Sequence, residues 1–150
     1  MRSMLGAVLV LAGMLASGAA AHEVKDGTIK IAHPHAAPTP AGAKTGAAYM
    51  EIVNTGKEPL VIKALSTPIA EKVEVHNVTM DGGIMRMRPV DLPLTVAAGE
   101  TLNLAKGRHV MLIGLKKPLV EEDMVGFKIE FANGKAMEFD LYVEQHHESH

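Results

Sequence analysis

The chain has 150 residues and a formal net charge of −2; it contains no cysteine or tryptophan, and aromatic residues make up only 3% of it. These totals fit one domain, and they exclude a strongly basic nucleic-acid surface, a disulfide framework and a blue-copper centre with a thiolate ligand. The chain does hold eight histidines and ten methionines. The placement of these two residue types therefore decides which site the domain could carry.

The first residues have the pattern of a secretory signal. Arg2 gives a basic start, residues 4–15 are almost all apolar, and small residues follow up to Ala21. The apolar run is too short to cross a bilayer, so we predict a cleaved signal over residues 1–21. His22 would then begin a periplasmic protein with no membrane span in its mature form.

After the signal, short β-favouring runs alternate with glycine, proline and asparagine, which is typical of an all-β sandwich or barrel. We predict a single domain over residues 22–144 and a flexible histidine-rich tail over residues 145–150. Tight hairpin turns are expected at Asp81-Gly82-Gly83 and at Ala132-Asn133-Gly134. A proline-rich surface loop is expected over His33 to Ala43. The predicted strands are Thr28 to Ala32, Ala47 to Val53, Leu60 to Leu65, Lys72 to Val78, Ile84 to Val90, Thr101 to Leu104, His109 to Leu115, Met124 to Phe131 and Lys135 to Val143.

Strand alternation singles out four side chains. His76 follows two valines that point to the opposite face, and His109 and Met111 share a face because they are two residues apart. Met87 lies between two arginines, which argues against a simply buried strand. Two imidazoles and two thioethers form a soft, uncharged ligand set that selects Cu(I) among common metals. Met85 could be a spare sulfur ligand or simple packing.

The spacing of these residues resembles the His-x10-Met-x21-His-x-Met signature of the periplasmic PCu(A)C copper chaperones. The neighbouring residues agree with it, in Glu71 to His76, Met80 to Val90 and His109 to Leu115. The resemblance covers about Gly42 to Val143. It implies a cupredoxin-like Greek-key β-barrel or sandwich. Such a domain binds Cu(I) at its surface through His76, Met87, His109 and Met111, and delivers it to a protein acceptor such as the copper site of cytochrome c oxidase. Because the sequence holds no motif of a known enzyme class, we also predict that the protein is not an enzyme.

Other histidines leave alternatives open. Some members of that family carry a tail that binds Cu(II), and His146, His147 and His150 look similar. The family usually has a tryptophan and an arginine where this chain has His33 to Ala37, a segment that could add metal ligands. His22 at a new N-terminus would offer an amine and an imidazole, so a copper-dependent redox enzyme using His22 and the tail is one alternative. An exported interaction domain without metal is another. No motif of a hydrolase, a thiol enzyme or a nucleotide-binding enzyme occurs in the sequence.

Overall fold

The computed structural model describes residues 23–147, and every regular element in that range is a β-strand. The predicted signal, His22 and His150 lie outside the described residues. Within residues 23–147 there is no helix with the length and apolar character needed to cross a membrane. The strands are β1 (Glu23–Asp26), β2 (Ile29–Ala36), β3 (Thr45–Asn54), β4 (Leu60–Ser66), β5 (Ala70–Asp81), β6 (Ile84–Val90), β7 (Leu94–Val96), β8 (Thr101–Asn103), β9 (Arg108–Leu115), β10 (Met124–Phe131) and β11 (Ala136–Val143).

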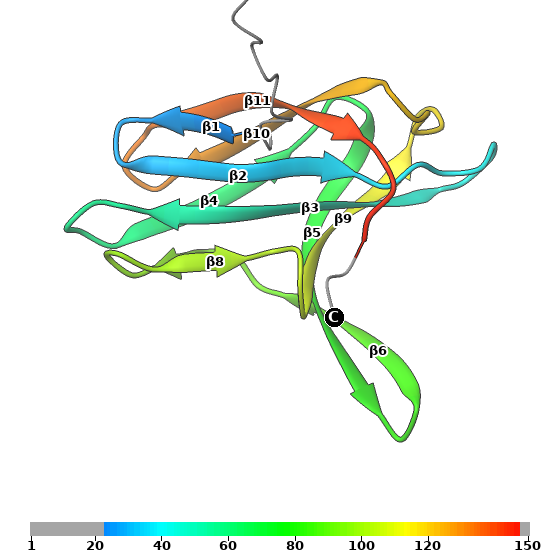
Figure 1. Cartoon of the computed structure of the whole chain (residues 1–150), viewed down its shortest axis with the longest axis horizontal. Coiled ribbons are helices and arrows are strands. Elements are labelled where there is room, and N and C mark those ends of the chain that lie inside the picture. The colour runs from blue at the N-terminus through cyan, green and yellow to red at the C-terminus, as the bar shows by residue number, and fades with distance from the viewer. Residues whose placement is uncertain (1–22, 148–150) are drawn as a thin grey trace, which may run out of the picture.

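The strands form one hydrogen-bonded sheet in the order β6-β5-β9-β3-β2-β11-β10-β4-β7, with β1 beside β2 and β8 beside β3. Neighbouring strands run antiparallel except β2 and β11, which run parallel. The sheet bends back on itself, because β4 contacts β5 and β7 contacts β3 (Figure 1). Two halves of the same sheet thereby enclose one core between them.

The core follows from alternation along the strands. In β3, β10 and β11 every second side chain is buried, as a sheet with one wet face requires. The rings of Phe127 and Phe139 pack with centroids 5.7 Å apart. The largest side chains with almost no exposure are Ile31, Met50, Ile52, Ile62, Leu104, Leu112, Leu119, Ile129 and Leu141.

The structure confirms the nine predicted strands to within a few residues at their ends. It adds β1 and β7, which are four and three residues long and too short to give a clear alternation. Both predicted hairpin turns are present. Gly82, Gly83 and Gly134 there adopt φ values of 57°, 81° and 85°, a region that glycine enters without steric cost.

The predicted surface loop is wrong over its first four residues, because β2 continues to Ala36. The register between β2 and β3 shifts by one residue between Ala32 and His35, so the strand contains a bulge. His33 lies in the bulge with φ of 50°. Without the extra residue, His33 would stand directly opposite the buried Met50 and face the core. The bulge instead leaves His33 exposed on the outer face of the sheet.

The β5–β6 hairpin projects from the body of the molecule, as Figure 1 shows at the lower right. β6 pairs only with β5 and ends one edge of the sheet. All of its residues up to Pro89 are exposed, and Met85 and Met87 are 61% and 48% exposed. Two of the predicted sulfur donors thus stand on a strand that solvent and a partner molecule can reach.

Candidate metal centre

Two predicted ligands face each other across neighbouring strands. His76 of β5 is paired directly with His109 of β9, and their rings lie 6.3 Å apart between centroids with planes inclined by 18°. The residues beside them, Val75 and Val110, are buried in the core. Alternation therefore fixes both imidazoles on the outer face of the sheet.

Met111 reaches one of these rings. It lies two residues beyond His109 on β9, and its Sδ is 3.0 Å from the Nε2 atom of His109. At that separation a nitrogen and a sulfur can bind the same ion. Side chains two apart on a strand start roughly 7 Å apart at the backbone, so this contact depends on the length of the methionine.

Glu74 orients the His76 ring from the same strand. Its Oε2 atom lies 2.8 Å from Nε2 of His76, and its Oε1 atom lies 2.5 Å from Nζ of Lys72. The hydrogen bond from Lys72, followed by that from His76, lowers the pKa of Glu74, so the carboxylate stays ionised. A proton on Nε2 that donates to Glu74 leaves the lone pair on Nδ1, and this buried nitrogen has no hydrogen-bond partner. Such a nitrogen suits a metal ion.

Met87 lies one diagonal step from this group. His76 pairs with Pro89 and Val78 pairs with Met87, so Met87 occupies the same face as His76 two residues along β6. Diagonal neighbours in a sheet are about 7–8 Å apart, within reach of a long side chain. Met85 pairs with Met80 nearer the hairpin turn and is a further two residues away. The structure brings His76, His109 and Met111 together and leaves Met87 beside them.

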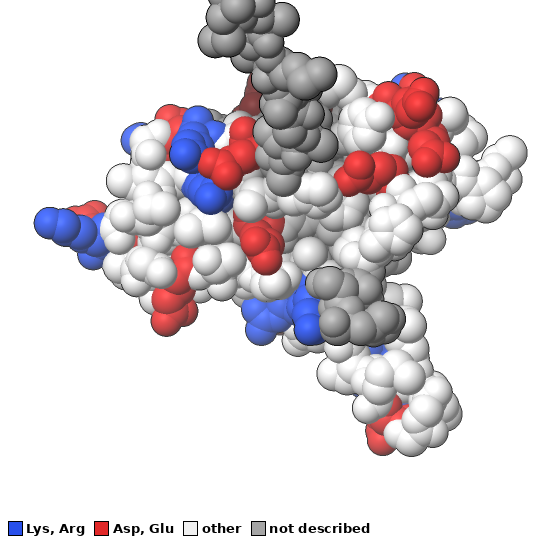
Figure 2. All heavy atoms as spheres, viewed as in Figure 1, with Lys and Arg blue, Asp and Glu red and all other residues white. Residues whose placement is uncertain are grey.

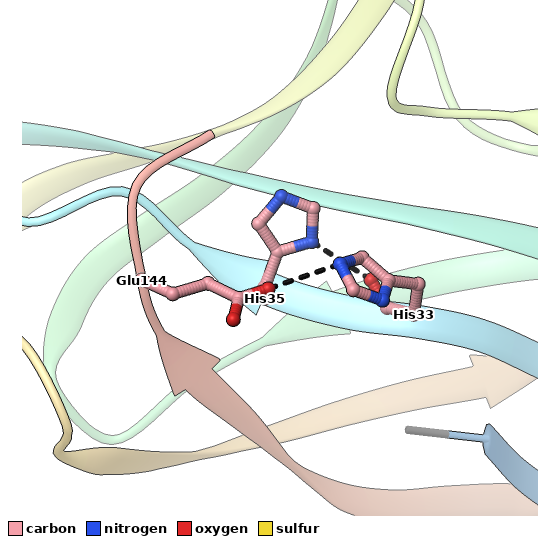
Figure 3. A group of neighbouring side chains, drawn as sticks. All are labelled: His33, His35 and Glu144. Atoms are coloured by element: carbon pink, nitrogen blue, oxygen red, sulfur yellow. Dashed lines mark hydrogen bonds and ion pairs between the residues drawn. The ribbon is translucent and has the colours of Figure 1, made fainter. Parts of the chain in front are cut away.

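A second histidine group lies at the end of β2. The Nε2 atom of His33 is 2.9 Å from Oε1 of Glu144, and Nδ1 of His35 donates to the carbonyl oxygen of His33 over 2.8 Å. One ligand atom from each of these three residues lies within 4.8 Å of the other two (Figure 3). Burial, above all, lowers the pKa of His35, which keeps its ring neutral at pH 7. The sequence singled out the two histidines of this group and missed Glu144, whose only signal was its place just before the tail.

The tail histidines take different places. His146 stacks on Tyr49 with ring centroids 3.6 Å apart, and its Nδ1 atom is 2.9 Å from Nε2 of His35. His147 is exposed. The Tyr49 ring also lies 6.1 Å from the ring of His109. A single tyrosine thus stands between the two histidine groups.

Charged side chains of both signs lie on the surface of the molecule. Figure 2 shows acidic and basic groups interspersed on the visible face. The mixture agrees with the net charge of −2.

The chain matches the family model of LpqE-like lipoproteins over residues 29–143. It belongs to the LpqE-like family. A curated relative is Lxx21020 of Leifsonia xyli subsp. xyli (strain CTCB07), which is named as a candidate lipoprotein. It is 30% identical over 95 residues, which are 63% of this chain and 57% of the relative, so the LpqE-like chain spans little more than half of that protein. A family of lipoproteins is one of exported proteins, in agreement with the predicted export signal.

Solved structures resemble the LpqE-like domain along most of its length. The copper-bound PCuAC domain from PmoF2 has a TM-score of 0.69 at 22% identity, over 83% of this chain and 98% of that one. The Cu(I) form of DR1885 from Deinococcus radiodurans has a TM-score of 0.57 at 30% identity, over 75% of each chain. Apo-DR1885 has a TM-score of 0.62 at 27% identity, over 97% of each chain. These similarities confirm the predicted cupredoxin-like all-β fold.

Proposed function

We propose that this LpqE-like protein is an exported copper carrier, and not an enzyme, which binds Cu(I) through His76, His109, Met111 and Met87. The observation that carries the proposal is the pair of imidazoles on facing strands, with the Met111 sulfur 3.0 Å from one of them. Neutral imidazoles and thioethers favour Cu(I) over zinc and over harder cations. The Cu(I) form of DR1885, 30% identical to this chain, supports the same cargo.

The donor set suits transfer as well as binding. It includes no thiolate and no carboxylate, so copper is held without an anionic anchor and can pass to an acceptor that offers thiolates. The thioethers need no deprotonation, and the set keeps half of its donors in acid. In the periplasm this acceptor would be a protein copper site, such as that of cytochrome c oxidase.

The geometry also indicates the order of exchange. His76 is anchored by Glu74, and His109 and Met111 lie on β9 in the body of the sheet. Met87 is 48% exposed on the edge strand β6. We propose that Met87 is the first ligand to leave when an acceptor approaches, because it is both the most exposed of the four and the only one on an edge strand.

Cu(II) binding by the tail histidines, His146, His147 and His150, is a further part of the proposal. His146 is the tail histidine that the described fold holds against other rings. Imidazole nitrogens suit Cu(II) as well as Cu(I).

The test is Cu(I) retention against a competing chromophoric chelator, measured on the processed protein. Replacing both sulfurs, in Met87→Leu with Met111→Leu, should weaken Cu(I) binding at least about tenfold, as the loss of groups that support a metal site commonly does. Met85→Leu is the matched control, since it removes an exposed thioether from the same strand. We expect it to change the affinity less than about twofold.

Thermal unfolding of the apo forms shows whether the variants keep the fold. An unchanged Cu(I) affinity in the folded double variant would refute the proposed ligand set. An equal loss of Cu(I) affinity in the Met85→Leu control would assign the role proposed for Met87 to Met85 instead.

A further inference from the structure

A cavity of about 620 Å³ opens beside the end of β2. Four of the six histidines in residues 23–147 line it: His33, His35, His146 and His147. Three carboxylates, Glu51, Glu121 and Glu144, line it as well. None of the four ligands proposed for Cu(I) belongs to this lining.

The donor atoms in the cavity lie close enough together to bind one ion. One ring nitrogen from each of His33 and His35 and one carboxylate oxygen of Glu144 lie mutually within 4.8 Å. Figure 3 shows both rings and the carboxylate turned toward one another between β2 and the segment after β11. His146 adds a third nitrogen, and thus a fourth donor, since its Nδ1 atom is 2.9 Å from Nε2 of His35.

The backbone holds these groups in place before any ion arrives. His35 pairs with Tyr142 of β11 in parallel register, and the amide of Glu144 donates to the carbonyl oxygen of Ala36 over 2.9 Å. The bulge in β2 and the positive φ of His33 turn that histidine outward. His35 is only 5% exposed and is fixed by its hydrogen bond to the His33 carbonyl oxygen. The donors therefore come from β2 and from the segment that follows β11, and not from the tail alone.

We propose that this pocket is a second metal site, which binds a divalent transition-metal ion, Cu(II) before others, through His33, His35, Glu144 and His146. Imidazole nitrogens with one carboxylate suit a borderline divalent ion, and Cu(II) binds such donors most tightly among the first-row divalent metals. The one thioether in the lining belongs to Met50, which is 1% exposed and packs in the hydrophobic core, so the pocket is a poor site for Cu(I). The carboxylate of Glu144 balances one of the two positive charges of Cu(II), whereas the ligands proposed for Cu(I) carry no negative charge.

The site stands independently of the proposed Cu(I) site, since the two ligand sets share no residue. It is an alternative to Cu(II) binding by the tail alone, with which it shares His146. The two proposed sites are nevertheless neighbours, because the Tyr49 ring stacks on His146 and lies 6.1 Å from the ring of His109. The protein would then sort two oxidation states of copper by donor chemistry on one face of one sheet.

The experiment titrates CuSO₄ and, separately, ZnSO₄ into the processed full-length apo protein, with calorimetry for both metals and electron paramagnetic resonance for Cu(II). The test variant is His33→Gln with Glu144→Gln, whose side chains are 52% and 34% exposed, so the fold should survive. His147→Gln is the matched control: it removes an exposed histidine that lines the same cavity but lies outside the converging group.

We expect one bound Cu(II) with nitrogen hyperfine structure, a weaker Zn(II) site, and a loss of Cu(II) affinity of at least about tenfold in the double variant. The control should change the affinity less than about twofold, and both variants should keep the Cu(I) affinity of the parent. Unchanged Cu(II) affinity in the double variant would overturn the site. So would an equal loss in His147→Gln, because binding would then belong to the tail. Failure of the Cu(I) proposal would instead appear in the methionine variants and leave these results intact.

Discussion

The two histidine groups of this protein lie on the same outer surface but are built in different ways. The group on β5 and β9 comes from regular strands, where His76 and His109 are direct partners and the neighbouring valines fill the core. The group on β2 and the segment after β11 needs a bulge and a positive φ at His33. The regular group supplies thioethers to its imidazoles, and the irregular one supplies a carboxylate.

One sheet can therefore offer two donor chemistries. Alternation alone placed the first group, because period-2 strands carry every second side chain to one face. The second group breaks that period at the bulge in β2, where His33 lies 2.9 Å from the carboxylate of Glu144, the residue that follows β11.

The largest effect is expected on the free energy of unfolding, from a change in the core packing on the inner face of β9. Leu112 is fully buried on the inner face of β9, the strand that carries His109 and Met111. Leu112→Ala should lower the free energy of unfolding of the apo protein by about 2–5 kcal/mol, because a cavity replaces packed atoms. Urea unfolding measures it. Met124→Ala, at a side chain that is 58% exposed, is the control and should cost less than about 1 kcal/mol. Equal costs would mean that β9 is not the packed frame of the first group.

A smaller effect is expected from Tyr49, whose replacement should change the Cu(II) affinity more than the Cu(I) affinity. Its ring stacks closely on His146 but only approaches His109 edge-on. Tyr49→Leu should weaken Cu(II) binding about three- to fivefold, the equivalent of losing one aromatic contact of about 1 kcal/mol, and should leave Cu(I) binding within about twofold. Competition titrations with each ion measure both affinities. An equal loss for both ions would show that Tyr49 supports the two sites alike.

The smallest effect concerns acid stability of the metal-free protein. Burial, the largest cause, lowers the pKa of His35 below its ordinary value of 6.5. Below pH 6.5 the unfolded chain therefore binds a proton that the folded chain refuses, so the free energy of unfolding should fall as pH drops from 7 toward the folded pKa. His35→Gln should flatten this slope in urea unfolding at pH 7.0, 6.0 and 5.5. Glu74 changes stability only at lower pH, because its lowered pKa lies below 4.5. A parent protein whose stability does not change over this range would contradict the account.

The sequence predicted most of the fold and the first group, because both rest on local rules. β-Favouring runs separated by glycine turns predicted nine strands and two hairpins. The alternation of side chains along each strand predicted that His76, His109 and Met111 lie on one face of the sheet. Met87 was harder to place, since its diagonal position depends on the register between β5 and β6.

The residues that could be ligands, and the face of each strand on which they lie, follow from the sequence, because alternation is a property of the chain over a few residues. The tertiary structure decided which of them meet. His33, which we expected in a surface loop, lies in a bulge of β2. The parallel pairing of β2 with β11 brings Glu144 close to it. No local pattern predicts such a contact, because strand order and register are fixed by packing of the whole core.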